Sequence, residues 1–161
     1  MQPQPTLAAL ARNPIHALAF GFGAGLAPRA PGTVGSLLAI PVYLLLAPLS
    51  APWYLALVTG LLLLGVWATG RCERDLGAHD HPGIVFDEIV GQLIALFLAP
   101  VHWVWLLIGF GLFRLFDIWK PGPIRWLNNR VPGGWGIMLD DVAAGMAAAL
   151  CLQGLILVYG R

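Results

Sequence analysis

Three long stretches without a single Asp, Glu, Lys or Arg constrain what this chain of 161 residues can fold into. They are Ala30–Gly70, Ile89–Phe113 and Val142–Gly160. Only 11% of all residues are charged, whereas a soluble domain has about 25%. A helix needs about 20 apolar residues to cross the hydrocarbon layer of a bilayer. The pattern therefore predicts an all-α fold, a polytopic integral membrane helical bundle.

Prolines at 48, 52 and 100 mark the expected helix boundaries, because a proline disfavours the helical conformation of the residue before it. We expect about five short helices, over Ser36–Leu49, Trp53–Gly70, Asp87–Ala99, His102–Asp117 and Asp140–Tyr159. The first and third would thin the bilayer or enter it without crossing. Residues 1–161 form one domain, of which 1–13 are expected to be a flexible N-terminus.

The charges separate the two ends of this bundle. The turns near Pro48 and Pro100 carry none, whereas every Arg and Lys except Arg161 lies at the opposite end. By the positive-inside rule that end is cytoplasmic, which predicts a multi-pass membrane protein whose acids face the cytoplasm. The net charge of +1 gives no indication of nucleic-acid binding.

All eight carboxylates lie at this cytoplasmic end. Asp87-Glu88 and Asp140-Asp141 each open an expected helix, and Asp117 ends another. One acid can cap a helix N-terminus, but capping does not require two adjacent acids at two helices. Capping remains an alternative for each pair alone; together they favour a site. Oxygen-rich clusters of this kind suit a hard cation such as Mg²⁺.

The other three acids are not assigned to the same site by their position alone. Glu73 and Asp75 are interpreted as interfacial surface charges. Asp80 lies between His79 and His81. This triplet is a candidate metal ligand set, although a solvated loop is the favoured interpretation.

Two further segments suit an anion. Residues 27–36 lead into the first expected helix and offer the hydroxyls of Thr33 and Ser36, so a phosphate could dock at the helix N-terminus. An N-cap by either hydroxyl is the alternative. Lys120 follows Asp117 by three residues and is expected to pair either with that carboxylate or with a phosphate.

Two features concern helix packing. Gln92 lies four residues after Glu88, where it either orients that carboxylate or forms a helix–helix hydrogen bond. The small residues of Val142–Ala149 predict close packing near the bundle centre and would also allow a homodimer.

Five motifs in order along residues 14–158 resemble the phosphatidylglycerophosphatase A family. They are Gly21-Phe-Gly-x-Gly-Leu-x-Pro28, Pro31-Gly-Thr-x-Gly-Ser36, His79-Asp-His81 followed by Ile84-Val-x-Asp-Glu-x-x-Gly91, Phe116-Asp-x-Trp-Lys-Pro-x-Pro-Ile124 and Gly136-Ile-Met-x-Asp-Asp-x-x-Ala-Gly145. The resemblance implies a Mg²⁺-dependent enzyme of the bacterial inner (cytoplasmic) membrane that hydrolyses phosphatidylglycerophosphate to phosphatidylglycerol and phosphate.

With that substrate, the residues predict a mechanism. The expected metal ligands are Asp80, Asp87, Glu88, Asp117, Asp140 and Asp141. The expected catalytic residues are Asp87, Asp117, Asp141 and Lys120, and the expected phosphate-binding residues are Thr33, Ser36 and Lys120. The ion would clamp phosphate oxygens and activate water, one carboxylate would accept the water's proton, and Lys120 would offset charge in the transition state. Water attack is preferred over an aspartyl-phosphate intermediate.

Two other classes of function compete with this one. A small cation- or proton-coupled transporter could use the same acids, but it would need carboxylates near the bilayer midplane, where the first three expected helices have none. A non-catalytic lipid-binding scaffold would bind lipid without a metal.

Overall fold

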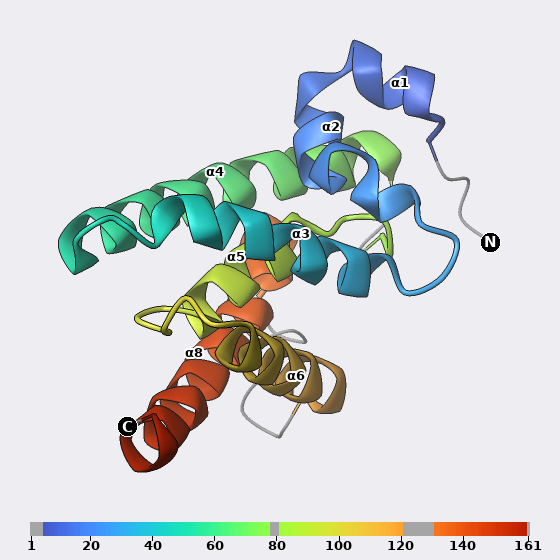
Figure 1. Ribbon diagram of the computed structural model, residues 1–161. Coiled ribbons are helices and arrows are strands. Elements are labelled where there is room, and N and C mark those ends of the chain that lie inside the picture. The colour runs from blue at the N-terminus through green and yellow to red at the C-terminus, as the bar shows by residue number, and fades with distance from the viewer. Residues whose placement is uncertain (1–4, 78–80, 121–130, 161) are drawn as a thin grey trace.

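The computed structural model describes residues 5–77, 81–120 and 131–160, and no strand occurs within these ranges. The elements are α1 (Leu7–Arg12), α2 (Pro14–Ala19), the 3₁₀ helix η1 (Gly21–Leu26), α3 (Pro31–Leu46), α4 (Ala51–Leu76), α5 (Phe86–Ala95), α6 (Trp103–Trp119) and α8 (Gly133–Tyr159). The short α5 lies at the centre, with α3 and α4 on one side and α6 and α8 on the other (Figure 1). The all-α prediction is confirmed, and the five expected helices correspond to α3, α4, α5, α6 and α8.

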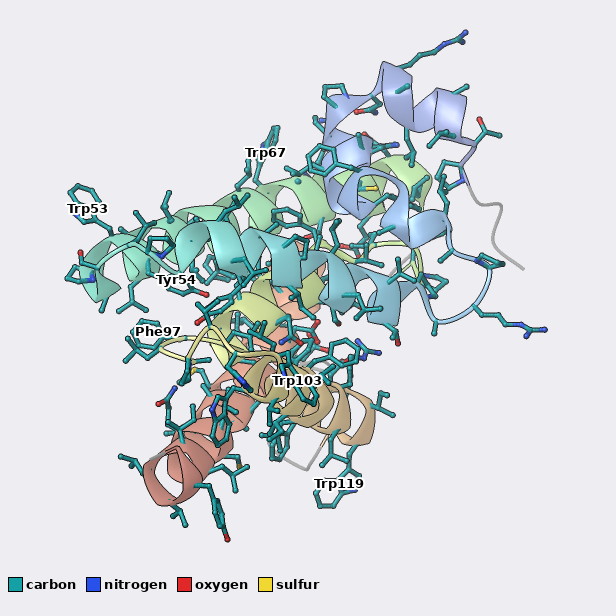
Figure 2. The ribbon with its side chains drawn as sticks, viewed as in Figure 1. Trp53, Tyr54, Trp67, Phe97, Trp103 and Trp119 are labelled. Atoms are coloured by element: carbon teal, nitrogen blue, oxygen red, sulfur yellow. The ribbon has the colours of Figure 1, made fainter. Side chains whose placement is uncertain are left out.

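Among the described residues, two helices are long and apolar enough to cross a membrane, α4 with 26 residues and α8 with 27. At 1.5 Å per residue each is about 40 Å long, more than the roughly 30 Å of a hydrocarbon layer. Only 22% of the apolar window of each helix is buried, whereas a core helix of a soluble protein is mostly buried. On α4, Trp53 and Trp67 are 69% and 55% exposed and point away from the bundle (Figure 2). These surfaces favour contact with lipid.

The central helix α5 ends inside the bundle. Its 10 residues span about 15 Å, which is too short to cross a bilayer. Side chains from three neighbouring helices satisfy carbonyls at and beyond its end: the Tyr43 hydroxyl donates to Ala99, the Tyr54 hydroxyl to Leu93 at 2.8 Å, and the Gln153 amide to Phe97 at 2.8 Å. Helix ends leave such carbonyls without partners, and apolar surroundings offer no water for them. These bonds anchor α5 and thereby its acidic first turn.

Glycines bring α5 and α8 into backbone contact. A Cβ added at Gly145 would lie 2.4 Å from the Gly91 carbonyl oxygen, and one at Gly91 would lie 2.8 Å from the Asp141 carbonyl oxygen. Asp87 lies one turn before Gly91, and Asp141 lies one turn before Gly145. The crossing therefore places these two acids side by side. It also confirms that the small-residue face of α8 packs near the bundle centre, where α8 contacts α4, α5 and α6.

Helix α8 begins earlier than the sequence predicts. Its first residue is Gly133, so Asp140 and Asp141 lie two turns inside the helix and do not open it. The prediction failed because glycine disfavours helix. Here tertiary packing dominates, since a Cβ at Gly134 would lie 1.9 Å from the Val66 carbonyl oxygen of α4. Capping of α8 by its two aspartates is therefore wrong.

Helices α3 and α5 also differ from expectation. Because α3 begins at Pro31 with Ala30 as its N-cap, Thr33 and Ser36 lie inside the helix and the N-cap alternative is wrong. Helix α5 ends at Ala95, four residues earlier than predicted, although it does begin with the expected acidic pair.

The helices α1, α2 and η1 are not among the expected elements, and α1 lies within the segment 1–13 for which a flexible N-terminus is expected. Helix α2 packs against the end of α4, and His16 Nε2 lies 3.2 Å from Asp75 Oδ2. Leu10 and Phe20 are buried. Asp75 is exposed and also pairs with Arg71 at 3.1 Å, which confirms its interpretation as a surface charge.

Candidate active site

Three carboxylates from two helices converge at the crossing of α5 and α8. Oxygens of Asp87, Glu88 and Asp141 all lie within 4.8 Å of one another. Asp87 is buried in the first turn of α5 together with the half-buried Glu88, and Asp141 is only 3% exposed. Buried carboxylates this close repel each other unless a cation or protons intervene. We refer to these three residues as the carboxylate triad.

The carboxylate triad fits a divalent cation. Glu88 Oε2 and Asp141 Oδ2 are buried and have no hydrogen-bond partner among the described residues. Burial, followed by the nearby Asp141 carboxylate, raises the pKa of Glu88 to about 8. Oxygens on opposite sides of a Mg²⁺ ion lie about 4.2 Å apart, since each Mg–O distance is about 2.1 Å. Ligand oxygens within 4.8 Å therefore need only a small adjustment around such an ion.

The N-terminus of α3 closes one side of the triad. A Cβ added at Gly32 would lie 1.9 Å from Glu88 Oε1 and 2.8 Å from its carboxyl carbon. Any larger residue would therefore displace the Glu88 carboxylate. The glycine also lets the positive end of the α3 dipole approach a negative group.

Arg114 connects α6 with α3 beside the triad. Its Nη1 lies 2.7 Å from Asp117 Oδ2 and donates to Ser36 Oγ at 3.3 Å. Ser36 in turn donates to the Gly32 carbonyl at 2.9 Å. Asp117 lies close enough to the Asp141 carboxyl group to interact with it. Sequence reasoning treated Arg114 only as a cytoplasmic charge, although its spacing of three residues from Asp117 on one helix face would have indicated the pair.

Lys120 pairs with Asp140, at 2.5 Å between Nζ and Oδ2. The expected pairing with Asp117 is therefore wrong, because that carboxylate is held by Arg114. Lys120 is the C-cap of α6 with φ of 42°, a left-handed conformation that turns the chain as the helix ends. Burial alone would lower the pKa of Lys120, but the hydrogen bond to Asp140 and the nearby acids outweigh it and raise the pKa. Lys120 is therefore charged.

The other residues named in the sequence analysis differ in burial and in hydrogen bonding. Thr33 is half-buried in the first turn of α3, and Asp80 lies outside the described residues. His81 is only 2% exposed and its Nδ1 accepts from the Gly83 N–H at 3.0 Å, so the solvated-loop interpretation is wrong for this residue. Gln92 is fully buried, and neither of its amide atoms has a partner among the described residues. Neither of its two expected hydrogen bonds is present.

The site thus combines buried carboxylates that could bind a metal ion with two cationic side chains. The bundle around it presents apolar helix surfaces that could lie in a membrane. This combination is typical of a class: membrane-associated helical proteins that could bind a metal ion and a phosphate-bearing substrate.

Comparison with known proteins identifies the family within this class. The family model for phosphatidylglycerophosphatase A matches residues 17–156, so the chain belongs to this family. Phosphatidylglycerophosphatase A of Escherichia coli K12 is 49% identical over 140 residues, 85% of this chain and 80% of that protein. The Haemophilus influenzae protein of the same name is 46% identical, with 86% of each chain covered. No solved structure matches the chain.

A third relative carries a different name. A Bacteroides thetaiotaomicron protein, provisionally named a phosphatidylinositol-3-phosphatase, is 43% identical over 134 residues, covering 78% of this chain and 83% of that protein.

Proposed function

We propose that this chain removes the terminal phosphate of phosphatidylglycerophosphate, releasing phosphatidylglycerol and phosphate in phospholipid biosynthesis, with Mg²⁺ bound by the carboxylate triad. The chain is a phosphoric monoester hydrolase by its family membership. One structural observation carries the metal assignment: three carboxylates converge in a buried position, and oxygens of two of them have no partner among the described residues.

The roles of the residues follow from their contacts. Asp87, Glu88 and Asp141 would hold the ion, which polarises phosphate oxygens and activates water when bound. Asp117 and Asp140 are each fixed by a cation, so they support the site from its edge. Lys120 brings a positive charge that offsets the charge developing on the phosphate. Thr33 and Ser36 remain candidate phosphate ligands, with the Ser36 hydroxyl also supporting Arg114.

Proton transfer follows the attack of water on phosphorus. As water bonds to phosphorus, the bond from phosphorus to the glycerol oxygen breaks. One carboxylate of the site accepts the proton of the attacking water, and that carboxyl group or a solvent water gives a proton to the leaving alkoxide, which becomes the hydroxyl of phosphatidylglycerol. Water attack needs no covalent enzyme intermediate, which makes it the simpler route than an aspartyl phosphate.

The membrane arrangement is also part of the proposal. Helices α4 and α8 would cross the cytoplasmic membrane of a bacterium, and the site would face the cytoplasm, where arginines and lysine gather. A lipid substrate in the inner leaflet then reaches the site without leaving the bilayer. Close small-residue helix faces also allow a homodimer.

Phosphate release by the purified protein in detergent tests this function. We expect hydrolysis of phosphatidylglycerophosphate that EDTA stops and added Mg²⁺ restores. The assay should also include phosphatidylinositol 3-phosphate as a substrate, because the Bacteroides relative is named as a phosphatase of that lipid. Asp75→Asn is the matched control for Asp141→Asn, since Asp75 is a paired surface carboxylate outside the site. Absence of phosphate release together with metal flux in proteoliposomes would favour the transporter instead.

A further inference from the structure

The guanidinium group of Arg114 is only partly used within the protein. Its Nη1 contacts Asp117 and Ser36, whereas its Nε is buried and has no hydrogen-bond partner among the described residues. A guanidinium carries five N–H donors in a fixed fork. Burying a donor without an acceptor costs free energy. The Nε edge of Arg114 therefore lacks an acceptor, and a phosphate accepts two parallel N–H bonds from such an edge.

Arg114 also lies at the edge of an apolar surface. An open depression of about 900 Å³ is lined by Gly111, Arg114, Leu115, Ile118 and Trp119, all from α6. Ile118 is 72% exposed and Trp119 65%, and Trp119 points away from the bundle (Figure 2). One cation beside an apolar surface matches an amphiphile with an anionic head.

We propose that Arg114 binds the phosphodiester of the lipid substrate, and that the surface of Leu115, Ile118 and Trp119 receives its acyl chains. This inference rests on the proposed function, because it places the reacting phosphomonoester at the carboxylate triad. Phosphatidylglycerophosphate carries its phosphodiester one glycerol unit away from the reacting phosphate. Arg114 contacts Asp117, which interacts with Asp141 of the triad. The cation is thus next to the reaction centre but faces a different part of the substrate.

Both cations are paired with a carboxylate, but only Arg114 has a buried donor, Nε, without a partner among the described residues, and this assigns the role to Arg114 and not to Lys120. Lys120 is already paired with Asp140 and lies at the end of α6. A lipid with a phosphomonoester but no phosphodiester, such as phosphatidic acid, leaves the Nε edge of Arg114 without an acceptor. Arg114 is therefore a determinant of substrate specificity, and phosphatidylinositol 3-phosphate, which also has both phosphates, would use it in the same way.

Comparison of two lipids with equal acyl chains tests the proposal. Wild-type protein should prefer phosphatidylglycerophosphate over phosphatidic acid in kcat/KM. Arg114→Gln should lower kcat/KM for phosphatidylglycerophosphate about 30-fold, as expected for lost hydrogen bonds to a charged group. The value for phosphatidic acid should fall by a smaller factor, because this lipid loses only the effect of the Arg114–Asp117 pair and has no phosphodiester to lose. Arg71→Gln is the matched control, because Arg71 also pairs with an aspartate but lies outside the site.

Equal losses on both lipids would overturn the proposal, because Arg114 would then act only through Asp117. Should Arg114→Gln fail to fold, Arg114→Lys decides the question. It keeps a charge beside Asp117 but not the planar fork. We expect it to retain phosphatidic acid hydrolysis and lose the preference; an unchanged preference would overturn the proposal.

The apolar surface has its own test. Ile118→Ser combined with Leu115→Ser changes only exposed side chains. It should raise KM for long-chain substrate severalfold without changing kcat, and leave a short-chain, water-soluble analogue unaffected. If KM rose equally for the long-chain and the short-chain substrate, Leu115 and Ile118 would not bind the acyl chains. A wild-type protein inactive on every lipid would instead refute the proposed function itself.

Discussion

Gly32→Ala should impair catalysis while leaving the fold intact. The added Cβ would lie 1.9 Å from Glu88 Oε1, whereas real contacts of this kind are not shorter than about 3.0 Å. The Glu88 carboxylate must therefore retreat by about 1 Å. The displaced atoms are the end of a flexible side chain, so the backbone need not move. A displacement of about 1 Å in a catalytic group can lower the rate about 100-fold.

Stability should behave in the opposite way. Alanine is favoured over glycine inside a helix by about 1 kcal/mol. If the added methyl group causes no strain, this gain raises the melting temperature by about 3 °C; if it causes a small local strain, the gain offsets that strain and the melting temperature stays unchanged. The assays are phosphate release, Mg²⁺ affinity by calorimetry and thermal unfolding. Gly60→Ala and Gly154→Ala are matched controls, since both glycines are helical and have open space around them. Wild-type turnover and metal affinity in Gly32→Ala would refute the placement of Glu88 at the site.

Three further perturbations test the carboxylates and their cations. Asp141→Asn should lower phosphate release at least about tenfold, or about 1.4 kcal/mol of barrier; wild-type turnover would contradict its role. Lys120→Ala leaves the buried Asp140 without its cation and should lower the free energy of unfolding by about 1–3 kcal/mol. Denaturant titration measures this change, and an unchanged midpoint would argue against the ion pair. Because the pKa of Glu88 is raised to about 8, Mg²⁺ must displace a proton, so affinity should rise from pH 6 to 8 and level off above. Calorimetry in buffers of different ionisation enthalpy would detect the released proton, and Glu88→Gln should weaken the pH dependence.

Charge and hydropathy patterns predicted the helices and the location of the acids, because both depend on local sequence. The acidic first turn of α5 and the position of Asp117 near the end of α6 follow from such patterns. The start of α8 did not, since Gly133 and Gly134 are poor helix formers and are held helical by contact with α4. Rules for helix boundaries that use only neighbouring residues cannot take account of a contact between residues 66 and 134.

Ion pairing distinguishes two of the predicted metal ligands, Asp117 and Asp140, from the carboxylate triad. The Arg114–Asp117 pair joins residues three apart on one helix, so its spacing could have revealed it. The Lys120–Asp140 pair joins residues twenty apart on different helices and depends on how α6 and α8 pack. Each pair neutralises one carboxylate at the edge of the site. The oxygens that converge belong to Asp87, Glu88 and Asp141. Arg114 and Lys120 therefore neutralise carboxylates beside the triad, and the three converging carboxylates still repel one another unless a cation or protons intervene.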